Sequence, residues 1–135
     1  MTAPPLQPMP FGHKTLSTDD KSACEFSRRL IQLFISETNR AIPITYMDTV
    51  LMVACNESKS VSEYAEMAGV SKSVMSRHLL DIGDRSRRMQ FGLVTSRLSP
   101  NEQGRYEIVL TAKGRSLATR ARGLLDQWTS TKSGT

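Results

Sequence analysis

The stretch from Val61 to Leu79 constrains the fold of this sequence more than any other. Its apolar residues follow a helical period, Gly69 interrupts that period, and a second helical pattern begins at Ser71. Glycine adopts a positive φ at little cost, which suits a tight turn between two helices. Ala65 is small, as two closely crossing helices require. The spacing predicts a helix-turn-helix motif, and an ordinary helical hairpin is the alternative interpretation.

The second helix of this motif presents a polar face if its apolar side is packed on the first helix. We expect Val70, Met75 and Leu79 to make that packing contact. The side chains that then face outward are short and polar or basic, and they suit phosphates and base edges in a DNA major groove. These residues are Ser71, Lys72, Ser73, Ser76 and Arg77.

Two helices are expected before the motif. The first has a helical apolar period from a cap at Ser17 or Thr18 to about residue 39. The second is apolar nearly all round, and we expect a cap at Thr45 and an end near Asn56. This second helix is therefore predicted to lie at the centre of the core.

A β-hairpin and one more helix are expected after the motif. Residues 92–98 and 105–110 have strand composition and flank a turn-rich stretch. Thr111 is predicted to cap the last helix. The order predicts a mainly α (α+β) fold, a winged helix-turn-helix with a two-stranded β-wing and flanking N- and C-terminal helices.

The positive charge of the chain is concentrated around the predicted motif and hairpin. The 135 residues include 18 Lys and Arg against 13 Asp and Glu. Residues 71–122 alone hold 11 basic and 4 acidic side chains. Such segregation attracts polyanions, of which nucleic acid is the first candidate and an anionic membrane the second. A solvated, solubilising face is the alternative interpretation.

Composition argues against several other classes of protein. The sequence has no run of about 18 apolar residues and no secretory signal pattern, so we expect a cytoplasmic protein without a membrane span. Cys24 and Cys55 are too few for a disulfide framework. No catalytic constellation, metal-ligand set or cofactor motif is recognisable, so we expect neither an enzyme nor a cofactor. Cys55 closes an apolar helix and is expected in the core.

Three motifs carry a resemblance to a known family. They are Gly69-Val70-Ser71-Lys72-Ser73-Val74-Met75-Ser76-Arg77, Gly92-Leu93-Val94 and Leu110-Thr111-Ala112-Lys113-Gly114-Arg115. Over about residues 45–122 the chain resembles the MarR family of bacterial transcriptional regulators. The resemblance implies a homodimeric winged-helix protein that binds a short, roughly palindromic operator, usually as a repressor.

The resemblance also implies roles for single residues. The outward residues of the second motif helix would contact DNA, and the wing would contribute Arg97 and the loop with Asn101, Gln103 and Arg105. The family usually has a wing arginine at the position of Gly104, and here Arg105 stands one residue later.

A basic insert at 84–90 makes the spacing between motif and hairpin longer than is usual in the family. We expect it to lengthen the recognition helix or its connection to the wing, and to place Arg85, Arg87 and Arg88 against phosphates. A solvated loop is the alternative.

The terminal helices are expected to dimerise. The last helix has a narrow apolar seam, and the first helix has an apolar face that can cover it. Pairing can occur within one chain or across two chains. Because two half-sites require a dimer, we expect the terminal helices to be exchanged. The residues concerned are Phe26, Leu30, Leu33, Phe34, Leu117, Ala121, Leu124 and Trp128.

The sequence thus predicts a proline-rich extended or disordered arm at 1–17, a winged-helix domain with dimerisation helices at 18–128, and a flexible tail at 129–135. The predicted function is sequence-specific binding of double-stranded DNA as a dimeric transcriptional regulator. Two alternatives stay open, a plasmid- or phage-type replication or partition accessory that binds DNA, and a winged-helix protein-interaction module. A small-molecule effector has no support in the sequence.

Overall fold

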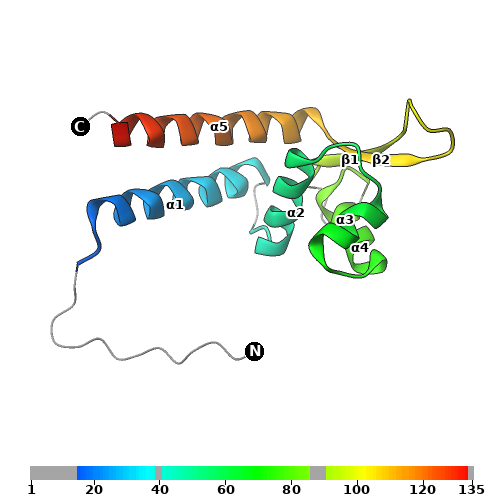
Figure 1. The fold of residues 1–135 in the computed structure, drawn as a ribbon, viewed down its shortest axis with the longest axis horizontal. Helices are drawn as coiled ribbons and strands as arrows, with labels where there is room; N and C mark the ends of the chain where they lie inside the picture. The colour runs from blue at the N-terminus through cyan, green and yellow to red at the C-terminus, as the bar shows by residue number, and fades with distance from the viewer. Residues whose placement is uncertain (1–14, 39–40, 86–90, 134–135) are drawn as a thin grey trace, which may run out of the picture.

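The computed structural model describes residues 15–38, 41–85 and 91–133. In this part of the chain five helices accompany one antiparallel two-stranded sheet (Figure 1). The elements are α1 (Thr18–Thr38), α2 (Ile44–Cys55), α3 (Val61–Ala68), α4 (Lys72–Ile82), β1 (Val94–Leu98), β2 (Tyr106–Leu110) and α5 (Ala112–Ser133). The order and types of these elements confirm the winged-helix fold class that the sequence predicts.

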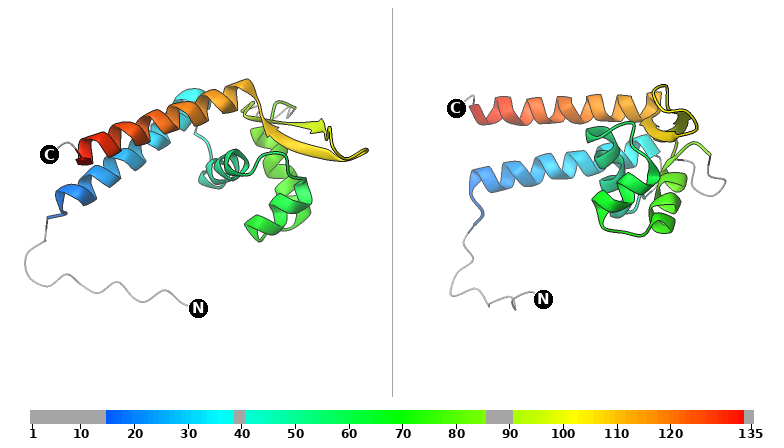
Figure 2. Two further views of the ribbon diagram at one scale, coloured as in Figure 1. Left: turned by 45° about the horizontal axis from the view of Figure 1, so that its top comes forward. Right: turned by 45° about the vertical axis from the view of Figure 1, so that its right-hand side comes forward.

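The two long terminal helices lie side by side and antiparallel, and they extend away from a body formed by α2, α3, α4 and the hairpin (Figures 1 and 2). The rings of Phe26 in α1 and Trp128 in α5 stack with their centroids 5.6 Å apart. Glu37 and Arg120 form an ion pair nearer the body. The terminal helices thus pair with each other in the single chain, and their exchange between two chains stays a prediction.

The core lies where the five helices meet the hairpin. Phe34, Val53, Tyr64, Ile82 and Leu93 are completely buried there. Val50 and Val53 of α2 belong to this core, as the apolar character of that helix predicts.

The Tyr64 side chain is the largest polar one in this core. Its hydroxyl donates a hydrogen bond of 2.5 Å to the carbonyl oxygen of Asn56. Burial raises the pKa of Tyr64 above its ordinary value of 10.0, because the phenolate would be desolvated. A hydrogen bond from the backbone of Lys59 lowers this pKa, and the charges of Glu57 and Glu107 raise it further.

Side chains cap the two terminal helices as the sequence predicts. The Ser17 hydroxyl oxygen accepts a hydrogen bond of 3.0 Å from the Asp20 amide, and α1 begins at Thr18. The Thr111 hydroxyl oxygen accepts a hydrogen bond of 3.1 Å from the Gly114 amide at the start of α5. The same hydroxyl donates to the Gly92 carbonyl oxygen at 2.6 Å and so ties α5 to the hairpin.

Four expectations about local structure are wrong. Pro43 precedes the first residue of α2, so Thr45 lies inside the helix and does not cap it. Residues 129–133 continue α5 and are not a flexible tail. Val70, expected to pack against the first motif helix, is 37% exposed. Cys55, expected in the core, lies at the surface because α2 turns this last residue away from the core. Residues 1–14 of the expected arm lie outside the described residues.

Candidate nucleic-acid interface

The helix-turn-helix motif is built by a cap at each end of α3. The Ser60 hydroxyl oxygen accepts from the Glu63 amide at 3.2 Å, and Glu63 Oε1 accepts from the Ser60 amide at 3.1 Å. At the other end Gly69 has a φ of 70°, a left-handed conformation that favours glycine. The Val70 amide then donates to the Ala65 carbonyl oxygen at 3.0 Å and closes the turn. These bonds fix where α4 begins.

Burial on one side of α4 defines its outward face. The Ser71 hydroxyl oxygen caps α4 by accepting a hydrogen bond of 3.2 Å from the Val74 amide. Met75, Leu79 and Ile82 are buried, so α4 is packed on the body along one stripe. The five residues predicted to face outward are all exposed, namely Ser71, Lys72, Ser73, Ser76 and Arg77.

Lys72 and Arg77 are the two cations on this outward face. Neither forms an ion pair with any carboxylate in the described residues. Their side chains are therefore available to an anion. A helix with short polar residues and unpaired cations on one exposed face fits phosphates and base edges in a major groove.

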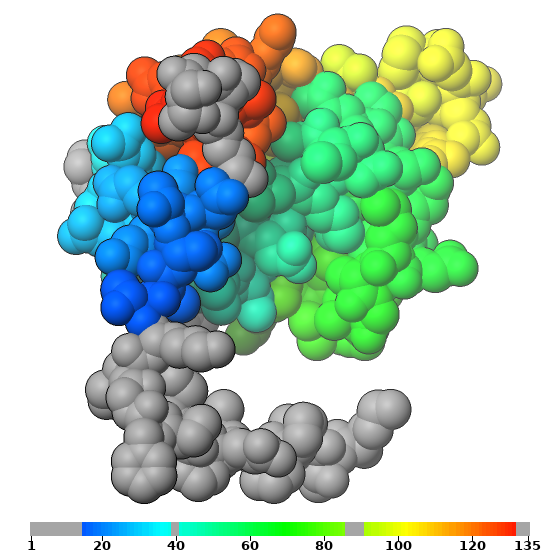
Figure 3. All heavy atoms as spheres, turned by 60° about the vertical axis from the view of Figure 1, so that its left-hand side comes forward, coloured from blue at the N-terminus to red at the C-terminus, as the bar shows by residue number. Residues whose placement is uncertain are grey.

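The wing projects next to the helix-turn-helix motif, as Figure 3 shows in yellow and green. In the hairpin Arg97 is paired in register with Glu107, and its Nε donates a hydrogen bond of 2.8 Å to Glu107 Oε1. Glu107 is only 4% exposed. The structure thus places Arg97 on the wing as predicted, with its guanidinium bound to a buried carboxylate.

The three predicted residues of the wing loop differ from one another in exposure and in hydrogen bonding. Asn101 and Gln103 are exposed. Arg105 is folded back, and its Nη1 donates to Glu102 Oε2 at 2.9 Å while its Nη2 donates to Glu63 of α3. The wing arginine is therefore bound to two carboxylates, one in its own loop and one in the helix-turn-helix motif.

The basic insert does not lengthen the recognition helix. The helix α4 ends at Ile82. The backbone after the insert is hydrogen-bonded to the backbone before it. The Leu93 amide donates to the Ile82 carbonyl oxygen at 2.8 Å, and the Gly92 amide donates to the Gly83 carbonyl oxygen at 2.9 Å. The described residues on the two sides of the insert therefore lie next to each other. Predicted contacts Arg87 and Arg88 lie outside the described residues.

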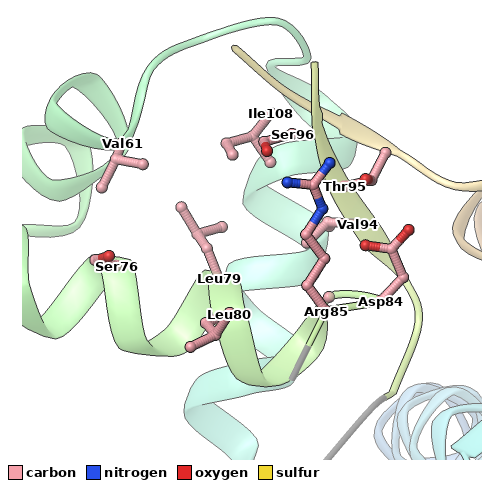
Figure 4. A pocket seen from close by; sticks show the side chains of 11 residues that line it. Val61, Ser76, Leu79, Leu80, Asp84, Arg85, Val94, Thr95, Ser96 and Ile108 are labelled. Atoms are coloured by element: carbon pink, nitrogen blue, oxygen red, sulfur yellow. The ribbon is translucent and has the colours of Figure 1, made fainter. Parts of the chain in front are cut away.

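Arg85 lines a pocket of about 190 Å³ between α4 and the hairpin. In Figure 4 its side chain lies beside Thr95 of β1, and Ser76, Leu79 and Leu80 line the pocket from α4. Arg85 is exposed, and the pocket that it lines lies between α4 and the hairpin. The predicted contact Arg85 thus lines the same pocket as Ser76, another candidate DNA-binding residue.

The eight predicted dimerisation residues lie between α1 and α5 of a single chain. Leu33, Phe34 and Leu117 are buried in the core of that chain. The other five are half-buried at the same contact and are Phe26, Leu30, Ala121, Leu124 and Trp128. The pairing of α1 and α5 accounts for their burial in the single chain, and their role in a dimer stays a prediction.

Sequence reasoning missed the carboxylates that bind the wing cations. Glu63 follows Ser60 by three residues, the capping-box spacing, so its place at the start of α3 was detectable. Its contact with Arg105 bridges 42 residues and has no local signal. Glu107 was detectable as a partner of Arg97 only with the exact strand register.

The described residues contain neither a helix that could span a membrane nor a cluster of side chains that could hold a metal ion. Within 15–38, 41–85 and 91–133 no helix is both long and apolar enough to span a bilayer. The same residues bring no three His, Cys, Asp or Glu side chains together as a metal site.

Comparison with known proteins relates the chain to one fold. No protein-family model and no curated protein matches the sequence. A MarR-like transcriptional regulator of Thermotoga maritima has 21% sequence identity and a TM-score of 0.59, over 87% of this chain and 81% of that one. FabT of Streptococcus pneumoniae, solved in complex with DNA, has 14% identity and a TM-score of 0.55, over 84% and 77%. A MarR transcriptional regulator of Methanosarcina mazei has 13% identity and a TM-score of 0.52, over 86% and 80%. The chain has the winged-helix fold of MarR-like regulators.

Proposed function

We propose that this chain is a transcriptional regulator that binds double-stranded DNA in a sequence-specific manner, and that it acts as a repressor. The observation that carries the proposal is the outward face of α4, where Lys72 and Arg77 have no carboxylate partner in the described part of the chain. A capped helix with such a face, beside a projecting wing, fits the major groove. That FabT, which has a similar fold, was solved with DNA supports the proposal. Because the proposed partner is DNA, we place the protein in the cytoplasm.

We further propose that the protein works as a homodimer on a short palindromic site. One helix-turn-helix motif reads one half-site, so two copies are needed for a palindrome. Apolar side chains on the outer faces of the terminal helices support this assembly, since Ile31 and Ile35 of α1 are 44% and 45% exposed and Leu125 of α5 is 44% exposed. Burial of these side chains against a second copy does not require exchange of the helices.

Fluorescence anisotropy of a mixed-sequence duplex in a salt series tests the DNA proposal. We expect tight binding at low salt and a log–log slope of about −0.9 for each phosphate contacted. Selection from random DNA is then expected to yield a palindromic site. Sedimentation of the protein is expected to show a dimer. Absence of binding at low salt contradicts the proposal and favours a protein-interaction module. Closely spaced direct repeats in place of a palindrome favour a replication or partition accessory.

A further inference from the structure

We propose that Glu63 of α3 and Glu102 of the wing loop mask Arg105 in the DNA-free protein and thereby weaken its binding to non-specific DNA. The inference deepens the proposed function and rests on it, because a masked cation affects DNA only if the wing approaches DNA. It assigns Glu63 as a positioning residue that controls the wing arginine.

The Arg105 side chain is held from two sides. Its Nη1 donates to Glu102 Oε2 at 2.9 Å, its Nη2 donates to Glu63 Oε1, and only 35% of the side chain is exposed. The backbone of Arg105 is held too, since its amide donates to the Glu102 carbonyl oxygen at 3.2 Å and its carbonyl oxygen accepts from the Ser99 amide at 2.7 Å. Arg105 thus has a fixed direction, toward α3.

Glu63 is fixed independently of the wing. Its Oε1 accepts a hydrogen bond of 3.1 Å from the Ser60 amide in the capping box, and its Oε2 lies 3.9 Å from Lys59 Nζ. The carboxylate is therefore already oriented when the wing arginine meets it, so little side-chain entropy is lost on forming the pair.

The resulting cluster is electrically balanced. Lys59 and Arg105 face Glu63 and Glu102, whereas Lys72 and Arg77 on α4 have no such partners among the described residues. Binding to non-specific DNA depends on phosphate contacts, and a cation that must first leave its carboxylates contributes less to it. Because partly exposed ion pairs are weak, the mask can be opened when the wing is pressed against a correct site.

The test compares Glu63→Gln with Glu66→Gln. Both changes remove one negative charge from α3, but Glu66 has no ion pair in the described residues, so it controls for the long-range field. Glutamine can replace glutamate in a capping box, which preserves the start of α3. Glu102→Gln is a second way to loosen the mask, at a loop residue whose side chain is 62% exposed.

Binding to a mixed-sequence duplex is measured by anisotropy in a salt series, after thermal unfolding shows that each variant is folded. We expect Glu63→Gln to make the log–log slope steeper than that of Glu66→Gln by about 0.9, the value for one phosphate contact. Arg105→Gln alone is expected to leave the slope of the unchanged protein as it is. The double variant with Glu63→Gln and Arg105→Gln is expected to lose the steeper salt slope of Glu63→Gln.

Two results overturn the mask. One is equal slopes for Glu63→Gln and Glu66→Gln, and the other is a slope about 0.9 flatter for Arg105→Gln alone, which shows that Arg105 already contacts phosphate. Failure of the unchanged protein to bind any duplex at low salt overturns the proposed function itself, so the two failures are distinguishable.

Discussion

The Tyr46 hydroxyl donates a hydrogen bond of 2.6 Å to Oδ2 of Asp81, and this bond joins the central helix α2 to the last turn of α4. The Tyr46 ring also meets the His78 ring edge-on, with centroids 5.0 Å apart, and the Phe91 ring at 6.4 Å. The orientation of the proposed recognition helix is therefore set partly by a residue outside the helix-turn-helix motif.

Replacement of Tyr46 by Phe is expected to lower the free energy of unfolding by about 1 kcal/mol, because the hydrogen bond to Asp81 is lost while the ring contacts can remain. Urea denaturation measures the change. Tyr106→Phe is the control, since Tyr106 is 61% exposed on the wing, and we expect its effect to stay within about 0.5 kcal/mol. Equal midpoints for the two variants would show that the hydrogen bond adds nothing to stability.

Two glycines of α5 are expected to respond in opposite directions to alanine. A Cβ at Gly114 would overlap the backbone carbonyl oxygen of Leu93, so α5 and the segment before β1 would have to move apart. We expect a loss of roughly 1–3 kcal/mol, the range for overpacked sites. A Cβ at Gly123 meets no described atom within 4 Å, and alanine there is expected to stabilise the helix by about 1 kcal/mol. Thermal unfolding of both variants tests the contrast, and a stabilised Gly114→Ala would contradict the close approach.

Stability is expected to fall at alkaline pH through Tyr64. Its pKa is raised in the folded state, so above pH 10.0 the unfolded chain loses the phenolic proton first and binds fewer protons than the folded chain. The contribution of Tyr64 to the free energy of unfolding is complete below pH 10.0. Above that pH it decreases by up to about 1.4 kcal/mol per pH unit until the pKa of Tyr64 in the folded protein is reached.

Urea denaturation at several pH values between 8 and 11 measures this dependence. Tyr64→Phe removes the titrating group and is expected to give a shallower decline, although it is less stable at pH 8 because the bond to Asn56 is lost. The same decline in both proteins would assign the effect to other groups.

The sequence predicts the helix-turn-helix motif well because its signals are local. Gly69 marks the turn, Ser71 marks the start of α4, and the apolar period of α4 defines which residues face outward. The cap of α2 is mispredicted because Pro43 fixes the backbone one residue before Ile44 without any side-chain cap, so Thr45 has no role to fill.

Contacts between distant segments were beyond sequence reasoning. The basic residues of the wing look available for DNA in the sequence, but Arg97 is bound to Glu107 and Arg105 to Glu63. These pairs depend on strand register and on how α3 meets the wing. The apolar seam of α5 likewise has no mark that decides between a partner in the same chain and one in a second copy.

Lys72 and Arg97 are expected to contribute differently to DNA binding. Lys72→Ala should flatten the log–log salt slope by about 0.9, because one unpaired cation on α4 is lost. Arg97→Ala should leave the slope unchanged, because its guanidinium is bound to Glu107. It should instead lower the free energy of unfolding by roughly 1–3 kcal/mol, since the buried Glu107 carboxylate loses its partner. A flatter slope for Arg97→Ala with unchanged stability would reverse this assignment.

Arg77 is expected to read a base, because it lies on the exposed face of α4 and a guanidinium can donate two hydrogen bonds to guanine O6 and N7. Arg77→Ala should then weaken binding to the selected site by about 1–3 kcal/mol and relax the preference at one base pair of each half-site. Lys72→Ala is the control, since a phosphate contact should weaken selected and mixed-sequence duplexes alike. Binding of Arg77→Ala to the selected site and to single-base variants measures the difference. Equal losses on selected and mixed duplexes would make Arg77 a phosphate contact, and base readout would then have to come from Ser73 and Ser76.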